Sequence, residues 1–493
     1  MAPRVDRVLW DRLFARTAAT GWPLQARLRE MMAAAISEGW LVPGTPLPSS
    51  RELAENLGVA RNTVLLAYQQ LVDEDLLESR ERSGYFVRQR GEAGQPARPA
   101  QPAAARLDWE HRFAIHPSAQ RNIVKPQDWL SYPYPFLYGQ FDPTLFPTND
   151  WRECARQALS VLEIRGWAPD LIDGDDPQLL EQIRTRVLPR RGIWASAEEI
   201  VVTLGAQQAL YMLARLLVRP GMVVGIEDPG YPDARNILTL CGAELRPVPV
   251  DAEGIVPDAI PPECRLLFVT PTRQCPTGVV LPLARRERLL ELAEARDLLL
   301  LEDDYESNFG LSSEAMPTLR SLDRSGRVLY VGSLSKTLAP GLRFGYIVAP
   351  SVVAREIRAM RRLILRHAPA NNQRALALFL ALSHFDRLLR KVTTVVGERG
   401  AAMRAALALH LPDFAYSYGS GGSSFWVQGP PGLDARDLAR RAAENGILIE
   451  AGDVFFMSPK PPLQHFRLGL ASLVAERIEP GIAALARLVR TPA

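Results

Sequence analysis

The chain has 493 residues, of which 47% are hydrophobic and 23% are charged, and its formal net charge is +3. This length exceeds one typical domain, and the composition is that of a globular protein, which excludes disordered and fibrous classes. Such a small net charge gives no whole-molecule argument for nucleic-acid binding, so DNA binding would require a local motif. Lysine is rare, because the 58 basic residues include only Lys125, Lys336, Lys391 and Lys460.

The four cysteines are scattered without CxxC or CxxH spacing. This pattern indicates reduced thiols, and we expect neither a disulfide framework nor a metal site. No apolar run approaches the roughly 18 residues that a membrane helix needs, and the N-terminus lacks the features of a signal peptide. We therefore expect a cytoplasmic protein that makes no membrane contact.

The N-terminal part of the chain predicts a small helical unit that ends in a hairpin. Apolar residues recur at helical spacing, Ser49 and Ser50 are suited to cap a helix, and polar residues mark a turn before the last strand. The predicted elements are helices over 24–36, 50–57 and 61–75, and a strand over 85–87. Their order is helix, helix, turn, helix and a two-stranded wing.

A change of composition divides the chain in two. Residues 91–106 are rich in Pro, Ala, Gly and Gln and predict an extended linker between a unit of residues 1–90 and a unit of residues 107–493. In the larger unit, short apolar runs alternate with helical stretches, which predicts a mostly parallel sheet with helices on both faces. Residues 375–493 are helix-rich and then strand-like, which predicts a smaller α+β subdomain.

The segment LPSSRELAENLGVARNTVLLAYQQLVDEDLLESRERSGYFV resembles the winged helix-turn-helix of GntR-type regulators, with a match over residues 10–88. Gly58 permits the tight turn between the two helices. Arg61, Asn62 and Thr63 begin the predicted recognition helix, where side chains reach base edges. Arg and Asn make bidentate contacts with guanine and adenine, so these residues are candidates for reading sequence.

Other side chains of this unit are candidates for contacts with phosphates or for wing contacts, which position the domain without reading sequence. These candidates are Arg51, Tyr68, Arg80 and Arg82. A helical bundle with a few exposed arginines is the alternative for any one of them. Residues 1–90 contain 12 arginines against 11 acidic residues, so folding has to create the basic face. We expect a dimer to bind double-stranded DNA at paired half-sites.

Four strings in the larger unit belong together: TLGAQQAL (203–210), EDPGYP (227–232), LEDDYES (301–307) and SLSKTLAPGLRFGY (333–346). In this order, with TPTRQCPTG (270–278) between the second and the third, they resemble the fold-type I aminotransferases. The same domain behind a GntR-type unit resembles the MocR/GabR family of regulators. The resemblance implies a multidomain chain, with an α+β winged helix-turn-helix before an α/β aminotransferase-like domain that carries the smaller subdomain.

The aminotransferase resemblance implies pyridoxal 5'-phosphate as cofactor, bound through a Schiff base to Lys336. Such a lysine has to be uncharged often enough to attack an aldehyde, so burial or nearby charge must lower its pKa. By the same resemblance, Asp303 lies beside the pyridine nitrogen, Tyr305 donates to the phenolate oxygen and Tyr231 stacks on the ring. The residues expected around the phosphate are Gly205, Ala206, Gln207, Ser333, Ser335 and Arg343.

The effector site follows the same resemblance. Arg467 matches the arginine with which aminotransferases bind a substrate carboxylate, and a surface or core-paired arginine is the alternative. An effector held by Arg467 would carry an anionic group, as an amino acid or an amino sulfonate does. The sequence departs from the family pattern at Arg273 and Cys275, which indicates an altered effector pocket.

Three hypotheses follow for the whole chain. The first is a regulator of nearby metabolic genes, in which an amino compound displaces Lys336 to form an external aldimine and thereby changes DNA binding. The resemblance implies a homodimer for it, domain-swapped through the linkers. The second is an aminotransferase with an appended DNA-binding domain, and the third is a DNA-binding protein whose large domain only dimerises. The motifs favour the first, and residual transaminase chemistry stays open.

Overall fold

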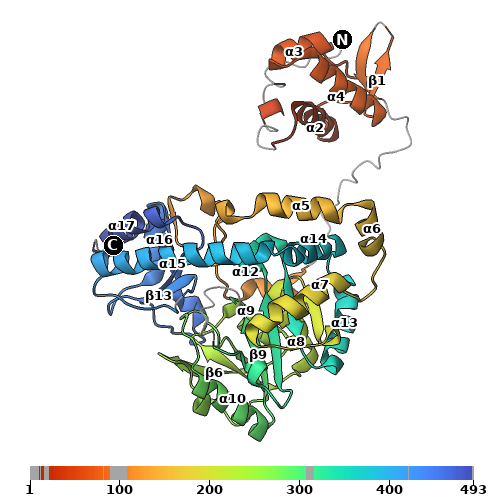
Figure 1. Ribbon diagram of the computed structural model, residues 1–493. Helices are drawn as coiled ribbons and strands as arrows, with labels where there is room; N and C mark the ends of the chain where they lie inside the picture. The colour runs from red at the N-terminus through yellow and green to blue at the C-terminus, as the bar shows by residue number, and fades with distance from the viewer. Residues whose placement is uncertain are drawn as a thin grey trace. The chain divides into compact units, whose positions relative to one another are not determined.

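The computed structural model describes residues 10, 13–15, 21–81, 83–88, 108–306, 316–419 and 421–490 (Figure 1). The chain divides into two compact units, Met1–Arg112 and Phe113–Ala493, and each is described by itself. The linker predicted over 91–106 lies outside the described residues. Within the described ranges, no helix combines the length and the apolar character needed to cross a membrane.

In the described part of the smaller unit, helices are followed by a hairpin. Its elements are α2 (Leu24–Ser37), α3 (Ser50–Leu57), α4 (Arg61–Asp73), β1 (Leu77–Arg80) and β2 (Gly84–Val87). The two strands pair antiparallel, with Leu77 opposite Val87. Leu28, Leu53 and Val64 contribute to one apolar core shared by the helices. The predicted order of helix, helix, turn, helix and wing is confirmed.

Local chemistry defines both ends of α3. The Ser49 hydroxyl accepts a hydrogen bond of 3.2 Å from the backbone N–H of Glu52 and so caps the first turn of α3. Gly58 ends α3 with a φ of 63°, a left-handed conformation that glycine adopts without a steric penalty. These two residues fix where α3 begins and ends.

The larger unit is built on an eight-stranded sheet. The strands lie in the order β4-β11-β10-β9-β8-β5-β6-β7, and those from β10 to β6 are parallel. β11 is antiparallel to both of its neighbours, and β7 is antiparallel to β6. The strand bounds are β4 (Ile200–Thr203), β5 (Val223–Asp228), β6 (Glu244–Asp251), β7 (Gly254–Ile255), β8 (Leu266–Val269), β9 (Leu299–Asp304), β10 (Val328–Ser333) and β11 (Gly345–Val348).

Helices cover both faces of this sheet, as the sequence predicts. Val201 and Val331 belong to one apolar cluster, whereas Val202 and Tyr330 belong to another, because neighbouring residues of a strand point to opposite faces. The first cluster includes residues of α8 (Gly205–Leu217), α9 (Pro232–Leu240) and α13 (Ser351–Leu365). The second includes residues of α5 (Thr148–Ala158), α7 (Pro177–Gln182), α14 (Ala370–Ala381) and α15 (His384–His410). A third cluster packs α10 (Leu283–Arg296) against the sheet.

A smaller subdomain follows, as predicted. Its antiparallel sheet has the order β12-β13-β16-β15. Its elements are β12 (Ala415–Ser417), β13 (Ser424–Gln428), α16 (Ala435–Glu444), β14 (Ile447–Leu448), β15 (Glu450–Ala451), β16 (His465–Gly469) and α17 (Ile478–Arg490). β3 (Tyr134–Pro135) pairs with β14, which ties an early segment of this unit to its last part. The remaining helices are α6 (Val161–Trp167), α11 (Leu319–Leu322) and α12 (Ser335–Leu338).

The capping role of Ser49 predicts a local loss of stability in the variant Ser49→Ala. Loss of this cap costs about 1 kcal/mol, so amides of α3 and α4 in the full chain should exchange hydrogen about fivefold faster. Hydrogen exchange followed by mass spectrometry measures this rate. Ser83→Ala, at an exposed position in the turn between β1 and β2, is the matched control. Unchanged exchange in Ser49→Ala would contradict the assigned role.

Candidate functional site

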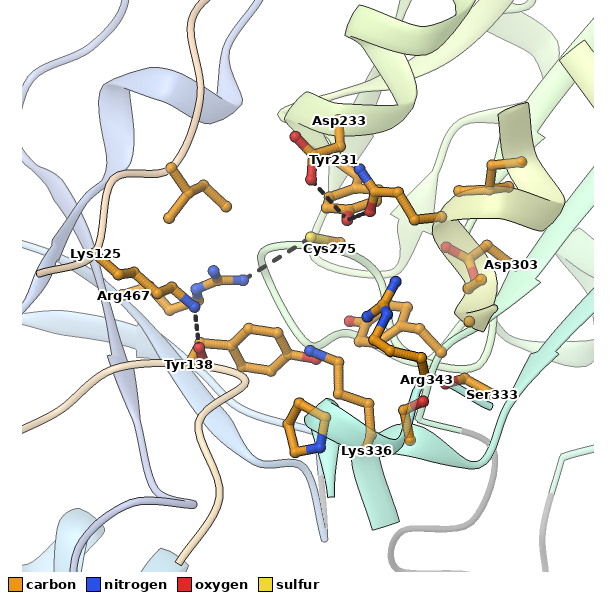
Figure 2. Close-up of a pocket in the computed structure, with 18 residues that line it drawn as sticks. Lys125, Tyr138, Tyr231, Asp233, Cys275, Asp303, Ser333, Lys336, Arg343 and Arg467 are labelled. Atoms are coloured by element: carbon orange, nitrogen blue, oxygen red, sulfur yellow. Dashed lines mark hydrogen bonds between the residues drawn. The ribbon is translucent and has the colours of Figure 1, made fainter. Parts of the chain in front are cut away.

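A pocket in the larger unit collects residues from β9, β10, β16 and the N-terminus of α8 (Figure 2). The carboxyl ends of parallel strands and the N-terminus of a helix meet there, which is where α/β sheets bind ligands. All the predicted cofactor and effector residues line it: Gly205, Ala206, Gln207, Tyr231, Asp303, Tyr305, Ser333, Ser335, Lys336, Arg343 and Arg467. The fold therefore brings together positions that are up to 262 residues apart in sequence.

Lys336 belongs to α12, directly after β10, and its amine points into the pocket. The Nζ atom lies 4.4 Å from the centroid of the Tyr138 ring. Burial, and next the nearby charge of Lys125, lower the pKa of Lys336 to about 8. The neutral share of the amine near physiological pH is consequently much larger than that of an ordinary lysine, and this neutral form has the free electron pair that attack on an aldehyde requires.

Asp303 presents an unpartnered acceptor. Its side chain is 2% exposed, and among the described residues no hydrogen-bond partner meets its Oδ1 atom. Burial, and next the charge of Asp304, raise the pKa of Asp303 to about 8. The neighbouring Asp304 differs, because its Oδ2 accepts from Arg191 Nε at 2.9 Å and from the Tyr330 hydroxyl at 2.8 Å. Of the two aspartates, only Asp303 lines the pocket and offers its carboxylate to a protonated ring nitrogen there.

The start of α8 and Arg343 form a cradle for an anion. Gly205 has a φ of 78°, and a Cβ atom at this position would lie 2.9 Å from Arg343 Nη2, so glycine lets the guanidinium approach the helix start. Arg343 Nη2 donates to Leu204 O at 3.2 Å. The backbone N–H groups of the first helical turn have no partner within the helix and, together with the guanidinium, suit a phosphate. Ser335 braces this loop, because its hydroxyl donates to Phe344 O at 3.0 Å and accepts from Phe344 N at 2.8 Å.

The two tyrosines that the resemblance expects to contact a ring, Tyr231 and Tyr305, both line the pocket. The Tyr231 hydroxyl lies 3.0 Å from both Gln207 Oε1 and Asp233 Oδ2. Tyr305 meets Tyr138 edge to face, with ring centroids 6.3 Å apart. Burial raises the pKa of Tyr305 well above its ordinary value, so its hydroxyl keeps a proton that it can donate.

Arg467 is buried and lies at the other end of the pocket, on β16. Its Nε donates to Glu450 Oε2 at 2.7 Å, and its guanidinium carbon lies 4.1 Å from the centroid of the Tyr138 ring. Among the described residues, its Nη2 atom has no hydrogen-bond partner. Arg467 is thus paired with Glu450 and still offers a buried donor to an anionic ligand. The alternative of a surface arginine is excluded.

Sequence reasoning missed several lining residues, of which Lys125, Tyr138 and Asp233 are polar. Lys125 and Tyr138 come from the segment that follows the linker, where no motif marks them. The rarity of lysine was the one available signal for Lys125. Of the two departures from the family pattern, Cys275 lines the pocket, whereas Arg273 pairs with Glu306 at 3.2 Å outside the lining set.

Most predicted DNA contacts lie on the surface of the smaller unit. Arg61 and Asn62 are exposed at the start of α4, with Thr63 half-buried beside them, and Arg61 Nε donates to Ser50 Oγ at 3.4 Å. Arg51 is exposed and forms an ion pair of 3.2 Å with Glu55. The first turn of α4 thus presents an arginine and an asparagine to solvent, as a recognition helix requires.

Three further predicted contacts have different outcomes. Arg80 is exposed, and its guanidinium lies over Phe86 at 4.3 Å in the wing. Arg82 lies outside the described residues. The prediction for Tyr68 is wrong: its side chain is fully buried and its hydroxyl donates to Pro48 O at 2.8 Å, so it stabilises the core and cannot face a phosphate.

Both parts of the chain are similar in sequence to known proteins. Residues 146–485 match the family model "Aminotransferase class I and II", and residues 24–87 match "Bacterial regulatory proteins, gntR family". The "HTH-type transcriptional regulator TauR" of Rhodobacter capsulatus is 45% identical, with 95% of this chain and 96% of that protein covered. The "Probable rhizopine catabolism regulatory protein MocR" of Rhizobium meliloti is 32% identical, with 94% and 93% covered.

Aminotransferases match a smaller share of the chain than these regulators do. The "2-aminoadipate transaminase" of Thermus thermophilus is 31% identical, with 72% of this chain and 89% of the enzyme covered. A crystal structure of the alpha-aminoadipate aminotransferase LysN of the same organism, complexed with N-(5'-phosphopyridoxyl)-L-leucine, superimposes with a TM-score of 0.71 at 29% identity. This similarity covers 78% of this chain and 98% of that one.

The close approach of Gly139 to Lys336 predicts a defect in the variant Gly139→Ala. Gly139 has a φ of 72°, and a Cβ atom there would lie 2.6 Å from Lys336 Nζ. The Lys336 amine would have to move away from its position in the pocket, so affinity for pyridoxal phosphate should fall about fivefold or more, which corresponds to about 1 kcal/mol. Titration of cofactor-free protein measures it. Gly326→Ala is the matched control, because Gly326 also has a φ of 72° but open space around it. Equal affinities in the two variants would contradict the assignment.

Proposed function

Because the chain belongs to the MocR family of transcription regulators, with a GntR-type DNA-binding domain before an aminotransferase-like domain, we propose that it controls transcription in response to an amino compound bound at a pyridoxal-phosphate site. The observation that carries this proposal is one pocket that holds the Lys336 amine, the Asp303 carboxylate, whose Oδ1 atom has no hydrogen-bond partner among the described residues, and the anion cradle at Arg343. We assign the DNA-binding domain to residues 1–90, the linker to 91–106 and the effector and dimerisation domain to 107–493.

The residues of the pocket fit the cofactor. Asp303 would accept a hydrogen bond from the protonated pyridine nitrogen, which would satisfy its orphaned oxygen and restore a low pKa. Arg343 and the first N–H groups of α8 would hold the phosphate, with Ser333 beside them. Tyr231 would cover the ring, and Tyr305 would donate to the phenolate oxygen. When bound, pyridoxal phosphate supplies an aldehyde carbon whose covalent bond to Lys336 can be exchanged for one to an effector amine.

Arg467 determines the effector class in this proposal. Glu450 holds the guanidinium by its Nε, so that Nη2 remains to bind an acid group of the effector. The effector would therefore be an amino acid or an amino sulfonate, and the solved relative complexed with a phosphopyridoxyl amino acid agrees with a pocket for both parts. An effector changes DNA binding only if it binds one conformation of the protein more tightly than another. We further propose a homodimer that engages paired half-sites.

Lys336→Ala tests the covalent site. The purified protein should show a visible absorption band of lysine-bound cofactor, and this band should be absent in Lys336→Ala, because alanine has no amine to bind the aldehyde. Absorption spectra of protein reconstituted with pyridoxal phosphate measure it. Lys391→Ala, at an exposed position on α15, should keep the band. A band that persists in Lys336→Ala would overturn the site.

A second measurement separates the regulator from an aminotransferase. Amino compounds that shift the absorption band are added to DNA-binding assays and, in parallel, incubated with a keto acid. A change in DNA affinity without steady turnover supports the regulator. Steady turnover without any effect on DNA binding supports the enzyme instead.

The recognition helix predicts that Arg61→Ala combined with Asn62→Ala weakens sequence-specific binding. Each lost bidentate contact costs about 1–3 kcal/mol, so affinity should fall at least about tenfold. Fluorescence anisotropy with DNA from the region upstream of the protein's own gene measures this loss at fixed salt concentration. Arg355→Ala removes an exposed arginine from the larger unit and serves as the control. Unchanged affinity in the double variant would exclude this recognition surface.

A further inference from the structure

A second lysine lies beside Lys336 at Gly139. A Cβ atom at Gly139 would lie 2.6 Å from Lys336 Nζ and 3.7 Å from Lys125 Nζ, so both amines lie close to the same point of the backbone. Both also face the ring of Tyr138, with Lys336 Nζ 4.4 Å and Lys125 Nζ 5.9 Å from its centroid. Figure 2 shows Lys125 entering the pocket from the side of Arg467 and Tyr138.

The position of Lys125 is fixed by its own contacts. Its Nζ lies 3.2 Å from Glu450 Oε1 and donates to the backbone carbonyl of Tyr138. Glu450 is itself buried and pairs with Arg467, so one carboxylate holds both cations. A carboxylate and a backbone carbonyl therefore hold the Lys125 ammonium group in place beside the pocket.

The chain around Lys125 is anchored on both sides of the pocket. The Asn236 amide of α9 donates to Asn122 Oδ1 at 2.7 Å, and Gln120 Nε2 donates to Asn236 O at 3.2 Å. On the side of the smaller subdomain, Arg121 Nη2 donates to Asp453 O at 2.7 Å. Lys125 thus reaches the pocket from a segment with several hydrogen bonds and is not a freely moving surface lysine.

Charges from several elements bear on the Lys336 amine. Like charges come from Lys125 and Arg467, and an opposite charge comes from Glu306, just after β9. The carboxylate of Glu450 contacts both Lys125 and Arg467. The other titratable groups that line this part of the pocket are Tyr138, Cys275, Asp303 and Tyr305. Burial raises the pKa of Tyr138, Cys275 and Tyr305, so these three are neutral near physiological pH and offset no cation. After burial, Lys125 is the largest cause of the lowered pKa of Lys336.

We propose that Lys125 is a positioning residue for Lys336: its positive charge disfavours a second positive charge on the neighbouring amine and so favours the neutral form of that amine, which attacks an aldehyde. The distances at Gly139 and the two contacts that hold Lys125 carry this proposal. It rests on the proposed function for the use of the neutral amine, but the charge state of Lys336 can be measured without any cofactor.

Because the chain contains only four lysines, NMR can follow the titration of each lysine side chain separately. Cofactor-free full-length protein labelled with ¹³C at lysine Cε gives four side-chain signals, and Lys336→Ala identifies that of Lys336. In Lys125→Met, the pH at which Lys336 titrates should rise by about 0.5 to 1 unit, as expected for loss of a like charge at this separation. Lys125→Arg keeps the charge and should titrate within about 0.2 unit of the wild type. Lys460→Met, at an exposed position, is the matched control and should leave the titration unchanged.

The outcomes are distinct. A raised titration in Lys125→Met with rescue by Lys125→Arg supports the proposal, because a purely structural role of Lys125 would not follow its charge. Equal titration of Lys336 in Lys125→Met and wild type overturns it. If Lys125→Met does not fold, a Lys336 titration in Lys125→Arg that departs from the wild type by more than about 0.5 unit overturns it as well. If the titration shifts as expected but the wild type forms no lysine-bound cofactor band, the proposed function fails and this inference stands.

Discussion

The structure depends on one electrostatic constraint: an amine and a carboxylate, Lys336 and Asp303, are buried in the same pocket without pairing to each other. Burial disfavours the charged form of each, which lowers the pKa of the lysine and raises that of the aspartate. Folding stability alone would be served better by pairing them or by apolar residues. An arrangement that leaves both available suits a ligand that brings an aldehyde for the amine and a cationic ring nitrogen for the carboxylate.

The parallel sheet makes this arrangement possible. Asp303 lies near the end of β9, and Lys336 follows β10, its parallel neighbour, so the two side chains reach the same edge. Arg343 lies just before β11, which pairs antiparallel with β4, and β4 leads into α8. Arg343 therefore lies at the start of α8, where Gly205 leaves room for its guanidinium. The smaller subdomain then contributes Arg467 and Glu450 from neighbouring strands, which gives the pocket a cofactor end and an acid-binding end.

The elements predicted from the sequence agree with the structure where interactions between residues close in the chain determine them. The Ser49 cap and the left-handed Gly58 define α3 from the residues themselves, and alternating apolar runs predict the covered sheet because burial on both faces requires them. They disagree at Tyr68, because an amphipathic tyrosine at helical spacing suits a core position as well as a DNA contact, and only packing against Pro48 decides between them. Lys125 escaped prediction for a related reason: its function depends on neighbours that no spacing along the chain reveals.

By itself, the sequence determined the two kinds of domain, the order of their elements and the residues whose chemistry a cofactor pocket needs, since motifs and periodicity reflect backbone geometry over short distances. Only the tertiary structure decided how those residues share their charges. It paired Asp304 with Arg191 and left Asp303 for the pocket, it gave Arg467 both a partner and a vacant donor, and it brought Lys125 and Lys336 together beside Gly139. The physical reason is that pKa values and hydrogen-bond partners depend on distances and burial across the fold, which residue order alone does not specify.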